Sequence, residues 1–156
     1  MCIRDSEKTL LSATGQPVDP ASVKQGQRLI IKLSGRPQAM RAMTAVIDDA
    51  LPAGFEIEQV LTPSDAQGVI GDTSKTPVGP FGFLGRLSQP SVQEKRDDRY
   101  VAAVALADGR PFVLAYVVRA TTPGDYFLPG AWASDMYRPA VAARTSHSRL
   151  KIAAAQ

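Results

Sequence analysis

Two apolar runs flank one turn in YVAAVALADGRPFVLAYVV, residues 100–118. The turn is Asp108-Gly109, a pair favoured between two strands because both positions accept positive φ. The pattern predicts a β-hairpin with Ala105 facing Phe112, Ala103 facing Leu114 and Val101 facing Tyr116. Both faces of these strands are largely apolar, which is typical of central strands covered on two sides. We expect a facing sheet on one side. On the other we expect a helix, a long loop or a neighbouring domain of a parent protein.

Short apolar runs bounded by turn residues recur on both sides of this stretch and predict further strands. They cover residues 28–33, 44–47, 55–60, 125–129 and 149–152. In residues 55–60 the alternation places Phe55 and Ile57 inward and the glutamates toward water. About seven strands without helical heptads predict an all-β fold, an antiparallel sandwich of the immunoglobulin or fibronectin type. The Cys…Trp…Cys pattern is missing, which favours the fibronectin-like branch.

Residues 62–90 interrupt this pattern with four prolines and five glycines. Such a stretch predicts a long connection, mostly without regular structure. Phosphate binding by its glycines is disfavoured, because no Gly-Lys-Ser/Thr follows. We expect an ordered Pro/Gly-rich loop held by Phe81, Phe83 and Leu84.

Length and composition fit one globular domain of 156 residues, with 44% hydrophobic and 21% charged residues. The net charge is only +3, and the basic residues are scattered along the chain. Nucleic acid is therefore not expected as a partner. Cys2 is the single cysteine and excludes an internal disulfide. Residues 1–6 lack the apolar core of a signal peptide and match no later pattern. We expect them to be a non-native start, followed by one domain at 7–156.

Candidates for catalysis are few. His147 is the only histidine and is expected in a solvated loop, and one His with one Cys cannot close a transition-metal site. The pairs Asp48-Asp49 and Asp97-Asp98 are not preset as acid and base, since neighbouring strand residues point to opposite faces. We expect these pairs to be solvated or bonded in turns. The sequence therefore predicts no enzyme, no metal and no cofactor.

The segment around Met136-Tyr137 has two interpretations. In one, Trp132 and Met136 plug the open end of the sandwich and Pro139 stops the strand. In the other, Met136 and Tyr137 are exposed in a loop and form an apolar cap for a site on another domain. Spacing alone favours the first.

Four segments, in order along the chain, resemble the last, C-terminal macroglobulin-like domain of bacterial alpha-2-macroglobulins. They are LPAGFEIE at 51–58, KRDDRYVAA at 95–103, LAYVVRATTPG at 114–124 and DMYRP at 135–139. The resemblance extends from about Glu7 to Ile152. Proteins of this family are envelope-associated protease traps: a protease cuts a bait region, and a Cys–Gln thioester then acylates the protease.

The resemblance implies that this domain is a latch whose Met136 and Tyr137 shield the thioester. It implies the thioester domain and other macroglobulin domains of the parent as partners, together with target proteases and a peptidoglycan-synthesising penicillin-binding protein. The expected location is the periplasm or cell envelope. The thioester motif Cys-x-Glu-Gln is absent, because Ile3-Arg4-Asp5 follows Cys2, so this chain can supply only the shielding module. The alternative is a fibronectin-like surface adhesion or spacer module without an inhibitory role.

Overall fold

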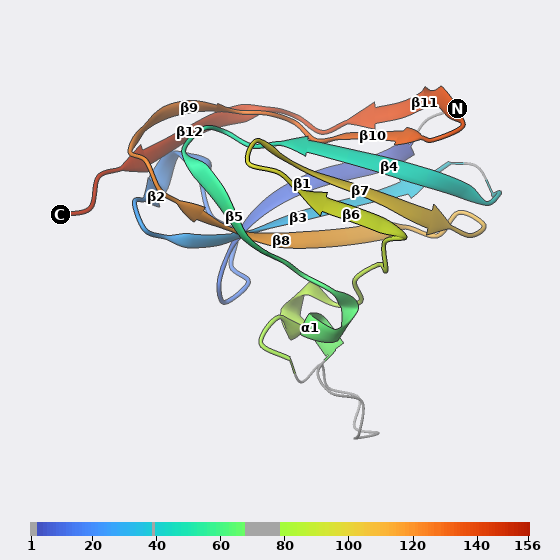
Figure 1. Ribbon diagram of the computed structural model, residues 1–156, viewed down its shortest axis with the longest axis horizontal. Coiled ribbons are helices and arrows are strands. Elements are labelled where there is room, and N and C mark those ends of the chain that lie inside the picture. The colour runs from blue at the N-terminus through green and yellow to red at the C-terminus, as the bar shows by residue number, and fades with distance from the viewer. Residues whose placement is uncertain (1–2, 39, 68–78) are drawn as a thin grey trace.

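Two antiparallel sheets pack face to face in the computed structural model, which describes residues 3–38, 40–67 and 79–156 (Figure 1). The first sheet has the order β1-β3-β8-β5. Its strands are β1 (Ile3–Ser12), β3 (Arg28–Pro37), β8 (Phe112–Ala120) and β5 (Phe55–Val60). The facing sheet has the order β11-β10-β4-β7-β6. Its strands are β11 (Arg138–Arg144), β10 (Trp132–Asp135), β4 (Met43–Ala50), β7 (Arg99–Leu106) and β6 (Val92–Lys95).

A smaller sheet, β2-β12-β9, lies at the end of the sandwich from which the C-terminus leaves (Figure 1). Its strands are β2 (Val23–Lys24), β12 (Ser148–Ala153) and β9 (Gly124–Leu128). The pairing of β2 with β12 is parallel. A short 3-10 helix, η1 (Pro20–Ser22), precedes β2 and is capped by Asp19, whose side chain accepts the Ala21 N–H. The strands β9–β10 and β11–β12 thus form one long ribbon that belongs first to the small sheet and then to the large one.

The predicted sandwich is confirmed, but the described chain has twelve strands rather than about seven. The strands that sequence reasoning missed are short or carry weak signals. β6 is exposed and polar, and β11 is rich in alanine, which has low strand propensity. β1 includes Ile3, a buried residue of the segment 1–6 that was expected to be non-native. Whether that segment is native stays a prediction.

The predicted hairpin at 100–118 is wrong in its pairing. β7 pairs with β4 and β6, whereas β8 pairs with β3 and β5, so the two strands lie in different sheets. The turn itself has the expected backbone, with positive φ at Asp108 (35°) and Gly109 (73°). Residues 107–111 bridge the roughly 10 Å between packed sheets. Turn chemistry bends the chain, but it does not choose the strand with which each arm forms hydrogen bonds.

The arms of this arch face each other across the core instead. The rings of Tyr100 on β7 and Tyr116 on β8 stack with centroids 4.7 Å apart. Both tyrosines are fully buried. Phe55 is buried in the same core, and Glu56 points to water, as the alternation predicted. The core therefore lies between the inward faces of the two large sheets.

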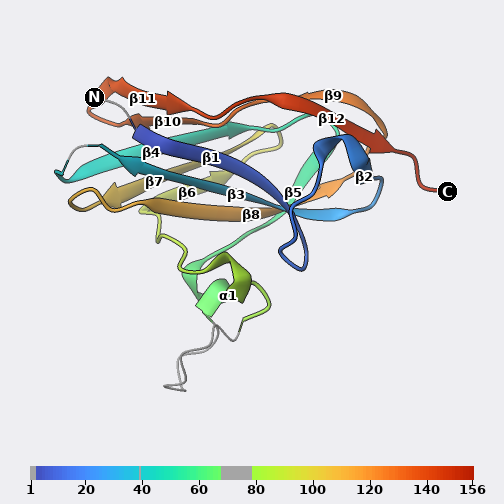
Figure 2. The same ribbon diagram turned by 180° about the vertical axis from the view of Figure 1, so that it is seen from behind.

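The long Pro/Gly-rich loop covers the outer face of the four-stranded sheet. A long loop was one of the three covers expected for the second apolar face, beside a helix and a neighbouring domain. Its short helices are α1 (Pro63–Gln67) and η2 (Gly82–Leu84), below the sandwich in Figures 1 and 2. Leu84 is buried against Ile30 and Val117 of the sheet, and Phe81 packs beside them. Phe83, the third expected anchor, is 42% exposed. Residues 68–78 of this loop, and Cys2, lie outside the described residues.

Within the described ranges, no helix has the length and apolar character needed to cross a membrane.

Candidate functional site

The segment Met136-Tyr137 forms the tip of the hairpin that joins β10 to β11. Neither residue has positive φ, so the tip is not one of the primed turns whose twist matches two flanking strands. The register of β10 and β11 shifts next to the tip: Ser134 is opposite Ala142, whereas the next residue, Asp135, is opposite Arg138. Such bulges redirect the end of a hairpin.

Asp135, the last residue of β10, holds the backbone of this tip through its side chain. Its side chain is buried, with 2% exposure. One carboxylate oxygen accepts the Tyr137 backbone N–H at 3.0 Å, and the other pairs with Arg138 Nη2 at 2.9 Å. The Met136 backbone N–H donates to the Thr44 carbonyl of β4 at 2.9 Å. Both tip residues therefore have their backbone fixed to the body of the sandwich.

The side chains of the tip point away from the protein. Met136 is 44% exposed and Tyr137 is 78% exposed. The interpretation in which Trp132 and Met136 plug the sandwich is thus wrong, as Trp132 is also exposed. Pro139 does not stop the strand either, because β11 continues to Arg144. An edge strand tolerates proline, whose missing N–H leaves no ladder bond unmade.

An apolar tip of this kind is suited to contact with another surface. Because the backbone of the tip is already fixed, a partner that covers it has to order only the side chains, which costs less for the tyrosine than for the flexible methionine. The nearest acidic side chain, Asp135, is buried and is engaged by the Tyr137 backbone N–H and by Arg138. The exposed thioether and phenol can cover a group on a neighbouring surface.

Sequence reasoning missed a second polar centre, at Asp49. Its carboxylate is fully buried between the sheets, accepts from Lys8 Nζ at 2.6 Å and accepts from Tyr116 OH at 2.5 Å. Lys8 Nζ also donates to the Pro129 carbonyl at 3.0 Å. The expectation that Asp48-Asp49 is solvated is therefore wrong for Asp49. Asp48 is partly exposed and pairs with Arg99 Nη1 at 3.1 Å.

The electrostatics of Asp49 indicate a structural role. Burial raises the pKa of its carboxyl, and Lys8 and the Tyr116 hydroxyl act in the opposite direction. Burial and the nearby carboxylate raise the pKa of Tyr116. The strand pattern held a signal for this position, because Met43, Ala45 and Ile47 alternate inward and Asp49 is next in the series.

The remaining candidates are solvent-facing. His147 lies exposed between β11 and β12, as expected, with its ring centroid 5.2 Å from that of Phe127. Asp97 and Asp98 are exposed in the turn between β6 and β7, and hydrogen bonding to Arg99 lowers the pKa of Asp98. No group of three potential metal-ligating side chains occurs in residues 3–38, 40–67 and 79–156.

Comparison with known families finds one that spans most of the chain. Residues 6–140 match the family described as "Bacterial Alpha-2-macroglobulin MG10 domain". The match includes β10 and the hairpin tip, and it ends within β11.

Individual relatives agree with this match. Alpha-2-macroglobulin of Xylella fastidiosa (strain Temecula1) is 37% identical over 132 residues, which cover 81% of this chain and 8% of the relative. Alpha-2-macroglobulin of Escherichia coli (strain K12) is 30% identical over 135 residues, covering 85% of this chain and 8% of the relative. A crystal structure of a Salmonella alpha-2-macroglobulin mutant matches 94% of this chain and 9% of its own, with a TM-score of 0.75 and 29% identity. The chain thus spans less than a tenth of each of these relatives.

Proposed function

The chain belongs to the MG10 domains of bacterial alpha-2-macroglobulins, and from this we propose that it is the latch domain of a protease inhibitor. In this proposal Met136 and Tyr137 shield the thioester of a neighbouring domain of the parent protein. One observation supports it above all: the two side chains are exposed on a tip whose backbone is held by Asp135 and Thr44.

The chemistry of a thioester calls for such a cover. A reactive acyl group hydrolyses when water reaches it, so a site that stores one must exclude water. A thioether and an aromatic ring exclude water over a flat area without offering a nucleophile. Burying one large apolar side chain contributes about 1.5–3 kcal/mol, enough to hold such a contact closed while leaving it reversible.

The proposal extends to partners and location. The other macroglobulin domains and the thioester domain of the parent would hold this domain in place, and target proteases would be trapped by the whole protein. A peptidoglycan-synthesising penicillin-binding protein is proposed as a further partner, in the periplasm or cell envelope. The domain itself contributes shielding and positioning rather than enzymatic turnover.

The test is made in the complete parent protein. Replacing Met136→Ala and Tyr137→Ala together should speed loss of the thioester about tenfold, as followed by incorporation of a labelled amine, since about 1.4 kcal/mol corresponds to a factor of ten. Val92→Ala is the matched control, because Val92 is 64% exposed on β6, at the opposite edge of the five-stranded sheet. Tyr137→Phe keeps the ring and should behave as the wild type.

Unchanged amine incorporation in the double variant would remove the shielding role. The fibronectin-like spacer module would then be the better description of this domain.

A further inference from the structure

A groove of about 420 Å³ lies where β9 passes into β10 and β11 into β12. The groove is lined by Phe127, Pro129, Trp132, Arg144 and His147 of the ribbon, by Asp48 of β4, the pairing partner of Trp132, and by Arg99 of β7. The bend that opens the groove is fixed by the backbone. A Cβ built on Gly130 would lie 2.0 Å from the Thr145 carbonyl oxygen, so glycine is required there. The groove is separate from the Met136-Tyr137 tip at the far end of the same ribbon.

Exposed apolar side chains concentrate on this ribbon. Seven large apolar side chains are exposed among the described residues, and four of them lie on the ribbon. Two of these are Phe127, 61% exposed, and Trp132, 38% exposed, both in the groove. Exposed apolar patches bordered by polar residues mark sites of interaction.

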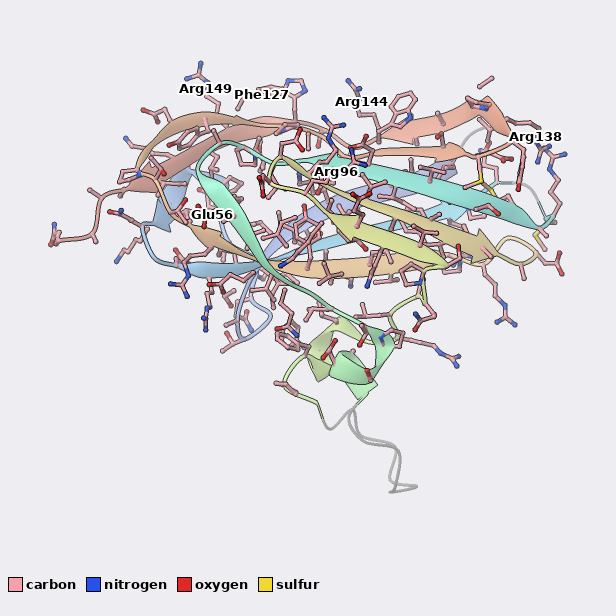
Figure 3. The ribbon with its side chains drawn as sticks, in the orientation of Figure 1. Glu56, Arg96, Phe127, Arg138, Arg144 and Arg149 are labelled. Atoms are coloured by element: carbon pink, nitrogen blue, oxygen red, sulfur yellow. The ribbon has the colours of Figure 1, made fainter. Side chains whose placement is uncertain are left out.

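Arginines accompany both aromatic residues. The Arg144 guanidinium lies 5.2 Å from the centre of the Trp132 ring, and Arg149 is directly opposite Phe127 in the pairing of β9 with β12. Figure 3 shows Arg149, Phe127 and Arg144 projecting from the same upper side of the ribbon. Across the described ranges, no acidic side chain is within ion-pair distance of Arg144 or Arg149. Arg99, by contrast, is paired with Asp48 and Asp98.

We propose that this groove binds an extended acidic segment of a protein partner, with carboxylates on Arg144 and Arg149 and an apolar side chain between Phe127 and Pro129. Guanidinium groups bind carboxylates bidentately. The contact with Trp132 holds the Arg144 guanidinium in one orientation before a ligand arrives.

Two other occupants fit less well. Sugar rings stack on free aromatic faces, but Arg144 lies over the Trp132 ring and His147 lies close to the Phe127 ring. A second copy of the chain would bring like charge against like, because the chain carries a net charge of +3.

The groove provides its own reporter, since Trp132 is the only tryptophan. The probe is a seven-residue peptide of alternating glutamate and leucine, titrated into the chain at low salt. We expect saturable change in Trp132 emission, none with the matching lysine–leucine peptide, and weaker binding at high salt. Absence of a saturable change, or an equal effect of the lysine peptide, would overturn the proposal.

Variants locate the binding by anisotropy of a labelled glutamate peptide. Arg144→Gln should weaken binding about tenfold, the effect of losing one charge-assisted pair. Arg110→Gln is the matched control, because Arg110 is exposed in the turn at 107–111 and away from the groove. Equal binding by the two variants would place the peptide elsewhere and refute the groove.

Two further outcomes would assign the groove to another occupant. A heparin-derived oligosaccharide that displaces the peptide at equal concentration would indicate an anionic glycan. A Trp132 emission that depends on the concentration of the chain itself would indicate self-association. Either result overturns the proposal of an acidic peptide.

Discussion

Asp49 carries its carboxylate in the centre of the sandwich, where it connects three strands. Lys8 comes from β1, Tyr116 from β8 and Asp49 itself from β4. A buried ion pair of this kind adds little net stability compared with an apolar replacement, but removing one partner is costly. The surviving charge then lies in a medium that solvates it poorly.

Lys8→Met isolates this effect. At neutral pH the variant should lose about 3 kcal/mol of unfolding free energy, since the Asp49 carboxylate loses its cation. Burial already raises the pKa of Asp49 above 3.8, and the variant should raise it further. Below about pH 3.8 the carboxyl is protonated in both proteins, so the difference between them should be small and should grow as pH rises. Urea unfolding at several pH values measures it; a difference independent of pH would contradict this account.

At the scale of the element, the β10–β11 hairpin shows how a short turn is made rigid without glycine. The tip residues use backbone bonds to Asp135 and to the carbonyl of Thr44 instead. A buried carboxylate that accepts a backbone N–H and pairs with Arg138 fixes the turn through charge-assisted bonds. Asp135 is therefore a positioning residue for the exposed side chains.

Asp135→Ala should loosen the tip while leaving the sandwich folded. The variant loses both the bond to the Tyr137 N–H and the pair with Arg138, and one charge-assisted bond of about 1.5–3 kcal/mol already raises the open population at least tenfold. Cleavage by chymotrypsin after Tyr137, followed by mass spectrometry, should accelerate accordingly. Asp135→Asn keeps an acceptor for the Tyr137 N–H, so its rate of cleavage should fall between those of the wild type and Asp135→Ala. Asp125→Ala, at an exposed position on β9, serves as control, and equal cleavage in all variants would exclude this role for Asp135.

At the scale of the whole molecule, the four-stranded sheet has apolar side chains on both faces. One face meets the opposing sheet, and the other is covered by the loop that carries α1 and η2. This explains how a sandwich can have central strands as apolar as β8. Figure 2 shows the loop and α1 below the sheet from behind.

Leu84→Ala tests whether the cover contributes to stability. Leu84 is buried in the outer cluster, so its truncation should lower the free energy of unfolding by about 2–3 kcal/mol. Phe83→Ala, at the preceding and exposed position, should cost about 1 kcal/mol or less. Chemical denaturation measures both. Equal losses would show that the loop does not bind the sheet through Leu84.

Part of this architecture was predictable from local patterns. The strands at 28–33, 44–47 and 55–60 were predicted because apolar alternation and turn residues act within a few positions of the chain. The exposed position of His147 was predicted because the residues that flank it are typical of a loop. The inward direction of Asp49 was also implied by the alternation of β4, but an acidic residue in the core requires a cation that only the fold brings to it. Lys8 lies forty-one residues away in the chain.

The sequence by itself determined the all-β class, the bend at Asp108-Gly109 and the resemblance that identified the family. The tertiary structure decided that β7 and β8 face each other across the core, and that Met136 and Tyr137 project outward. It also decided that Arg144 lies over Trp132. Local preferences depend on neighbouring residues and can be read along the chain. The pairing of strands depends on which apolar faces cover one another, and this is settled only when distant segments pack together.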